Sequence, residues 1–140
     1  MSVRVQNLDS IGAVLATFTV SQTAGSDDLT DADIGKAVTL TADYEVGPGA
    51  DNDTLLGKLI DLTLQDADTG KRMATVQIGG ICTLPLSTPV PGVNQMVVCG
   101  PNGTVKVAPA LISNDPEGGA NARGHVVAVN GSTDCTLILN

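Results

Sequence analysis

The feature that most constrains the fold is a series of short runs rich in Val, Ile and Thr, separated by segments that contain glycine, proline, asparagine or aspartate. β-branched side chains are stiff at χ1 and suit a pleated sheet. The 16 glycines and 7 prolines recur too often for a helix of several turns. We therefore expect an all-β chain with little helix, with strands at residues 13–20, 37–42, 55–64, 73–82, 95–99, 104–107, 124–130 and 135–139.

The segments between these runs predict how the strands are connected. Residues 100–103 contain an Asn-Gly pair, which tolerates positive φ and is a strong hairpin signal, and residues 66–70 and 130–134 are similar turns. These connections predict a largely antiparallel, meandering sheet, with long loops at residues 44–53 and 113–121. Thr30 is positioned to cap a short helical turn at residues 29–34. The pair Gly79-Gly80, inside a strand, indicates a bulge or a close backbone contact.

Alternation predicts which side chains face the core, because neighbouring residues of a strand point to opposite faces. We expect Val38 and Leu40 to face inward, with Thr39 and Thr41 facing outward. In the next strand we expect the inward residues to be Ile60, Leu62 and Leu64, and the outward residues to be Leu59, Asp61 and Thr63.

Composition argues against several classes of function. Phe18 and Tyr44 are the only aromatic residues and there is no Trp, so stacking platforms for sugars or bases are scarce and a small-molecule substrate is not expected. The formal net charge of −8 argues against nucleic acid or an anionic membrane as a partner, since both attract Lys and Arg. No run approaches the roughly 20 apolar residues of a membrane span, and the first residues do not resemble a secretory signal.

The nucleophiles and the histidine form no catalytic signature. His125 is the only histidine and begins a strand, so we expect an exposed or edge side chain. Ser87 and Ser132 lack a nucleophile-elbow pattern. Cys82, Cys99 and Cys135 lie in apolar runs and are expected to be buried thiols, with one disulfide and a leftover thiol as the alternative. We expect no catalytic residues, no cofactor and no enzymatic activity.

Acidic residues form two clusters that could suggest a cation site. Asp51-Asn52-Asp53 superficially resembles a calcium loop, but the alternation of ligands and the distant Glu of that motif are missing. No close Cys or His pair suggests zinc. We interpret both clusters as solvated loops and expect no metal; the other cluster consists of Asp27, Asp28, Asp31 and Asp33.

From residue 34 to the end, the order of the strand-like phrases resembles the capsid decoration, or cement, proteins of tailed bacteriophages. The phrases that carry the resemblance are residues 34–40 (IGKAVTL), 56–60 (LGKLI), 74–85 (ATVQIGGICTLP), 91–93 (PGV), 97–105 (VVCGPNGTV) and 124–129 (GHVVAV), with a closing strand that ends at Asn140. They cover about three quarters of the chain, and they form an ordering of strands without a catalytic motif. The N-terminal 30 residues fall outside the match.

The resemblance implies a small antiparallel β-barrel or β-tulip domain at residues 31–140. For residues 1–30 we expect an N-terminal arm and first strand, ordered by a partner, because the first ten residues have no clear pattern. It implies a structural virion protein, made in the host cytoplasm, that binds the major capsid protein on the outer capsid surface and stabilises the shell. It further implies a homotrimer at local three-fold positions, with contact residues that no motif identifies. The alternatives are another phage structural module, such as a head-fibre base or a tail-associated β-domain, and a carbohydrate-binding or adhesion module.

Overall fold

The computed structural model describes residues 8–109 and 122–139, and these residues form an almost entirely β structure. The elements in chain order are β1 (Val14–Val20), β2 (Gln22–Thr23), β3 (Ser26–Asp27), the 3-10 helix η1 (Asp31–Asp33), β4 (Ala37–Ala42), β5 (Glu45–Pro48), β6 (Gly57–Leu62), β7 (Met73–Pro85), β8 (Val97–Cys99), the 3-10 helix η2 (Pro101–Gly103), β9 (Val105–Val107), β10 (His125–Asn130) and β11 (Asp134–Leu139). The predicted small all-β barrel is confirmed.

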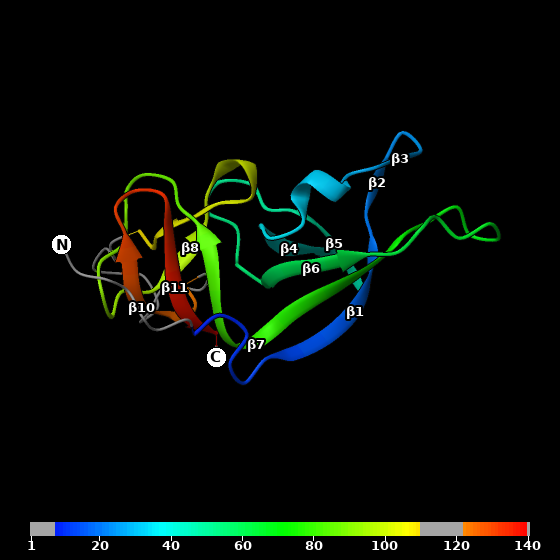
Figure 1. Cartoon of the computed structure of the whole chain (residues 1–140). Helices are drawn as coiled ribbons and strands as arrows, with labels where there is room; N and C mark the ends of the chain where they lie inside the picture. The colour runs from blue at the N-terminus through cyan, green and yellow to red at the C-terminus, as the bar shows by residue number, and fades with distance from the viewer. Residues whose placement is uncertain (1–7, 110–121, 140) are drawn as a thin grey trace.

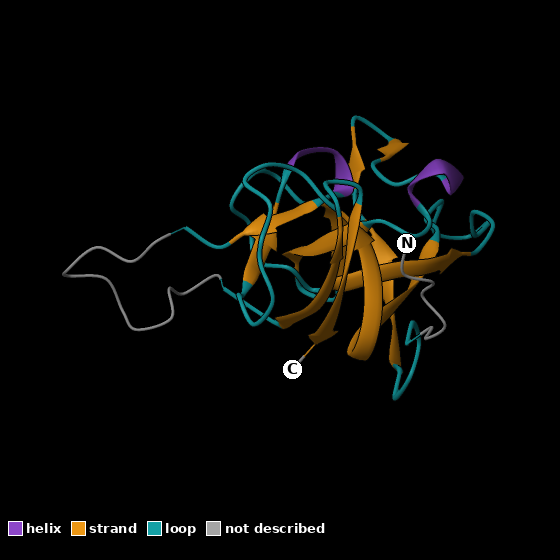
Figure 2. Cartoon of the chain, turned by 60° about the vertical axis from the view of Figure 1, so that its left-hand side comes forward, coloured by secondary structure: helices purple, strands orange, loops and turns teal. Residues whose placement is uncertain are grey.

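The strands surround a common interior (Figure 2). Five of them close into a barrel in the order β1-β5-β4-β6-β7, and β7 returns to pair with β1. Every pairing in this ring is antiparallel except that between β1 and β5. Closure leaves these strands with no open edge in the paired region. The barrel interior is aliphatic, and its buried residues are Val20, Leu29, Val38, Val46, Leu59, Leu62, Ala74 and Val76.

The long strand β7 belongs to two sheets (Figure 1). Its first half pairs with β1 and β6, and its second half pairs with β11, which in turn pairs with β10. The second sheet and the β8–β9 hairpin enclose a separate core, formed by Ala37, Leu55, Cys82, Leu84, Leu86, Val97, Cys99, Val105, Val126, Cys135, Leu137 and Leu139. The protein is therefore a barrel with an attached hairpin layer, joined through one shared strand.

The strand changes sheet at the Gly79-Gly80 pair, which confirms the predicted close backbone contact. Gly80 has φ +85° and lies against the backbone of Gly12. Ser10 and Ile11 of this N-terminal turn exchange backbone hydrogen bonds with Ile81, of 2.8 and 2.9 Å. The turn is thus fixed to the bend of β7.

The predicted turns are also confirmed. Residues 100–103 connect β8 to β9 with Asn102 and Gly103 at positive φ, and Gly131 at positive φ lies in the β10–β11 connection. Residues 66–70 lie between β6 and β7, where the Asp66 carbonyl accepts the Gly70 amide at 2.7 Å. At η1, Thr30 occupies the N-cap position as expected, and its backbone amide donates to the Asp33 carboxylate at 2.8 Å.

Two expectations from the sequence are wrong. The segment at residues 44–53 is not entirely a loop, because its first half forms β5, with Val46 fully buried. Turn-forming residues concealed this four-residue strand. The faces of β6 are wrong at two positions: Leu59 is fully buried and Leu64 is 89% exposed, because the pairing shifts between Leu59 and Asp61 and the strand ends at Leu62. Beyond the shift, Leu62 is buried and Asp61 is exposed, as predicted. A shift of one residue exchanges the two faces.

In β4 the predicted faces hold only in part. Val38 is fully buried as expected, but Leu40 is 51% exposed and Thr39 is only 7% exposed. Thr39 is covered because its hydroxyl donates to the Thr54 carbonyl at 2.7 Å, whereas Leu40 lines an open hollow.

The N-terminal part of the chain contributes to the barrel, since β1 pairs on both sides and Val20 lies in its core. Residues 1–7 and the loop predicted at residues 113–121 lie outside the described residues. A separate organisation of residues 1–30 as a partner-ordered arm stays a prediction. Within the described ranges, no helix is long and apolar enough to cross a membrane.

Candidate functional site

The three cysteines are buried free thiols in the described structure. Cys82 and Cys135 come from the paired strands β7 and β11, and Cys99 from β8. Burial raises the pKa of each thiol to about 12, with smaller contributions from nearby charges. Because the thiolate is the nucleophilic and metal-binding form, these side chains act as small apolar core residues at neutral pH.

His125 begins β10 on the outer face of the second sheet and is exposed, as predicted. Its direct neighbour across the β10–β11 pair is Ile138, which is apolar. Ser87 lies on the chain after β7, and its hydroxyl is buried without a hydrogen-bond partner in the structure. Ser132 lies in the exposed β10–β11 turn.

The acidic side chains of the first cluster have different partners. The Asp27 carboxylate accepts a hydrogen bond from the Gln22 side-chain amide at 2.9 Å. The Asp28 carboxylate accepts one from the Ser21 hydroxyl at 2.7 Å. Asp31 pairs with Arg72 at 2.6 Å.

The second cluster is divided in the same way, since Asp51 pairs with Lys106 at 2.8 Å and Asp53 accepts the Ala50 amide at 2.9 Å. No group of three or more His, Cys, Asp or Glu within the described ranges is arranged to hold a metal ion.

Arg123 is the most engaged cation of the described chain. Its guanidinium donates to the carbonyls of Leu55, at 3.0 Å, of Leu56, and of Ile78, at 2.6 Å. Its backbone also exchanges two hydrogen bonds of 2.9 Å with Val97. Burial lowers the pKa of the guanidinium, which nevertheless stays protonated at neutral pH. Arg123 therefore ties the second core to the barrel.

Beside Arg123 the surface is hollowed by about 590 Å³, a volume within the usual range of ligand pockets. The hollow is lined by Thr39, Leu40, Asp53, Thr54, Leu55, Leu56 and Arg123. The side chains of Thr39, Asp53 and Arg123 are already hydrogen-bonded within the chain, and the rest of the lining is mainly apolar. The hollow is better suited to an apolar protein segment than to a polar small molecule.

A second exposed surface lies where the barrel meets the second sheet, and we call it the junction face (Ile11, Val14, Ile81 and Ile138). Ile81 and Ile138 are direct neighbours across β7 and β11, and Ile11 bonds to the backbone of Ile81. Val14 lies opposite Gly79 in β7. Ile11, Val14 and Ile138 are 51, 54 and 39% exposed, which is unusual for neighbouring large apolar residues in a monomer.

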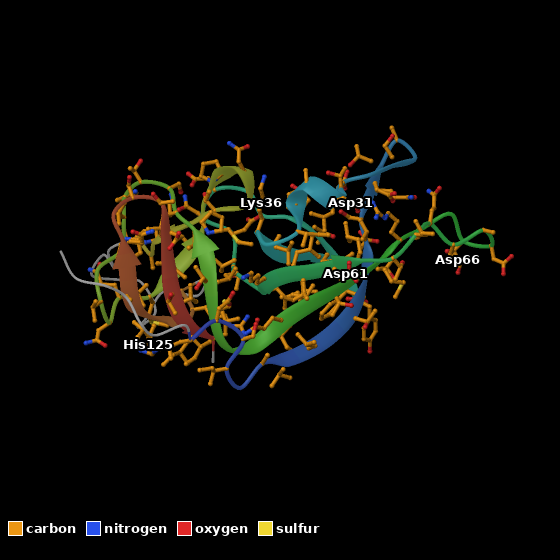
Figure 3. All side chains as sticks on the ribbon, in the orientation of Figure 1. Asp31, Lys36, Asp61, Asp66 and His125 are labelled. Atoms are coloured by element: carbon orange, nitrogen blue, oxygen red, sulfur yellow. The ribbon has the colours of Figure 1, made fainter. Side chains whose placement is uncertain are left out.

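The described acid closest in sequence to Ile11 of the junction face is paired within the subunit. Asp9, the nearest acid in the chain, is held by Lys58 at 3.0 Å and by the Thr83 amide at 3.0 Å. In contrast, Asp31, Asp61 and Asp66 lie toward the other end of the molecule, away from His125 (Figure 3). Among residues 8–109 and 122–139, the junction face is thus apolar, and these three acids lie away from His125, which pairs with Ile138 across β10 and β11.

The junction face does not follow from the sequence pattern. Ile81 and Ile138 each stand next to a buried residue, Cys82 and Leu137, so alternation within an apolar strand gives no contrast between its two faces. Ile11 and Val14 join the face only because the N-terminal turn folds onto β7. No family model, curated protein or solved structure matches this chain.

Proposed function

We propose that the chain is a structural virion protein that binds the outer surface of a phage capsid and stabilises the shell as a homotrimer at local three-fold positions. The observation that carries this proposal is the junction face, an exposed apolar surface formed by described residues of a strongly acidic chain. Its partner is a protein, since exposed apolar surfaces of this kind are typical of protein interfaces.

The charge distribution supports contact between copies of the chain at this face. Subunits with a net charge of −8 repel one another, so copies associate most readily where acids are absent or internally paired. The junction face meets this condition because Asp9 is paired with Lys58 within the subunit. Cyclic symmetry would then give three equivalent sites for the coat protein, one on each subunit.

A trimer also explains how a small subunit with few aromatic residues could bind a shell. Once one subunit is bound, the contacts of the other two become intramolecular, and avidity gains of about 10²–10⁴ follow when the geometry matches. A protein that binds the assembled shell, but not free coat protein, stabilises the shell by mass action. The proposal includes no catalytic step.

The direct test is the mass of the protein in solution, measured by light scattering. We expect about three times 14.1 kDa for the wild type and a shift toward 14.1 kDa for Ile11→Asp, which places a charge in the junction face. Leu64→Asp is the matched control, because Leu64 is 89% exposed and lies in the distant β6–β7 connection.

Because Ile11→Asp could fail to fold, a second variant, Ile138→Thr, makes a milder change within strand β11. It should also weaken the trimer. A monomeric wild type, or an Ile11→Asp variant that remains trimeric, would contradict this role for the junction face.

A further inference from the structure

The only two aromatic residues of the chain line the same hollow. This hollow of about 470 Å³ is lined by Phe18, Leu40, Ala42, Asp43 and Tyr44, and we call it the aromatic groove. Leu40 also lines the hollow beside Arg123, so the two adjoin at this residue. Aromatic residues are strongly enriched among the side chains that dominate binding energy in protein interfaces.

Tyr44 occupies a backbone conformation that does not suit it. It lies in the two-residue turn between β4 and β5, with φ +57°, and its carbonyl accepts the Thr19 amide at 2.9 Å. A left-handed conformation is unfavourable for residues other than glycine, asparagine and aspartate, and hairpin turns of this length usually have glycine there. The side chain is also 82% exposed, so its burial within the subunit does not compensate.

An exposed aromatic side chain in an unfavourable conformation points to a role in binding. Tyr44 extends from the turn at the margin of the aromatic groove, while Phe18 is partly buried against the barrel core. Phe18, Tyr44 and Leu40 together form an apolar surface, and a partner that covered it would remove this surface from water.

The charges around the aromatic groove identify the kind of partner. Asp43 lines it, and Asp53 lines the adjoining hollow. The one cation in these linings, Arg123, donates to three backbone carbonyls of its own subunit. An apolar segment with a neighbouring Lys or Arg would therefore fit this surface best.

A second copy of the chain fits poorly here. Of the six described Lys and Arg residues, Lys36, Lys58, Arg72 and Lys106 are in ion pairs within the subunit, and Arg123 is engaged with the backbone. The sixth, Lys71, has acidic neighbours in the same β6–β7 connection, Asp66 and Asp68. A copy would bring mainly acids to Asp43, and the two would repel.

We propose that the aromatic groove is the contact for the coat protein and receives an extended coat segment that carries an aliphatic side chain next to a Lys or Arg. This inference rests on the proposed function and deepens it, since it assigns the shell contact to a surface distinct from the junction face.

The test is co-sedimentation of the trimer with phage shells that lack it, comparing wild type with Tyr44→Gly. Glycine relieves the unfavourable φ, so we expect an unchanged or higher Tm and an unchanged mass by light scattering. Shell affinity should nevertheless fall about tenfold or more, as for loss of an aromatic hot spot. Tyr44→Phe keeps the ring and should bind like wild type, and Leu64→Ala controls for loss of an exposed apolar side chain.

Charge is tested with Asp43→Lys, which should weaken shell binding, against Asp68→Lys in the distant β6–β7 connection, which should not. If wild type pellets with shells and Tyr44→Gly pellets equally well, the aromatic groove is not the contact, although the proposed function stands. If the wild-type trimer remains in the supernatant, the proposed function fails and this inference fails with it.

Discussion

Substituting Gly80 tests whether the N-terminal turn is fixed to β7, which is the contact that builds the junction face. In Gly80→Ala the added methyl group would lie 2.7 Å from the Ile11 carbonyl oxygen and closer still to the backbone of Gly12. Alanine at φ +85° costs about 1–2 kcal/mol, partly offset by about 0.4–1 kcal/mol from a less flexible unfolded chain.

The clash adds a second cost, because backbone atoms must move. Displacing the turn breaks its two hydrogen bonds with Ile81, each contributing about 0.5–1.5 kcal/mol. We therefore expect Gly80→Ala to lower the free energy of unfolding by about 2–4 kcal/mol.

Gly25→Ala is the matched control, since Gly25 has φ +81° but no atom within 4 Å of the new methyl group. It should cost only about 1 kcal/mol, from backbone strain alone. Urea unfolding of both variants measures the difference. Equal losses of stability would refute the reasoning, because they would show that the contact between the turn and β7 contributes nothing.

Two further predictions concern the core. Arg123→Met removes charged hydrogen bonds to the carbonyls of Leu55, Leu56 and Ile78, so the free energy of unfolding measured in urea should fall by about 3 kcal/mol. A loss below about 1 kcal/mol would contradict the role of Arg123 in joining the second core to the barrel. Burial raises the cysteine pKa values from about 9 to about 12, so the thiols of the unfolded chain lose their protons at lower pH than those of the folded protein. The free energy of unfolding should therefore be retained below pH 9 and fall between pH 9 and 12. Urea unfolding across this range checks the fall, and thiol labelling that is rapid in the native protein at pH 8 would contradict the buried assignment.

Sequence patterning predicted the strands and turns well because they depend on local chemistry. Val, Ile and Thr runs marked every long strand, and Asn102-Gly103 marked a hairpin from its tolerance of positive φ. Sequence patterning failed where contacts between distant segments determine the local structure. β5 is short and follows Tyr44 in a turn of unusual composition, and the faces of β6 depend on a shift in pairing that local alternation does not contain.

The candidate surfaces were beyond the reach of pattern reasoning for a related reason. The junction face is assembled from a turn near residue 11 and strands about 70 and 127 residues further along the chain, and only the folded pairing brings them together. The aromatic groove likewise joins Phe18 to Tyr44 through the closed barrel. The cysteines and His125, whose surroundings follow from their own strands, were placed correctly.

The most direct test of the account is co-sedimentation of the wild-type protein with expanded phage shells that lack it, after its mass has been measured on the same sample. We expect a particle near three times 14.1 kDa that pellets with the shells and protects them against heat. A monomer that remains in the supernatant would contradict the central claim and would favour a different structural role.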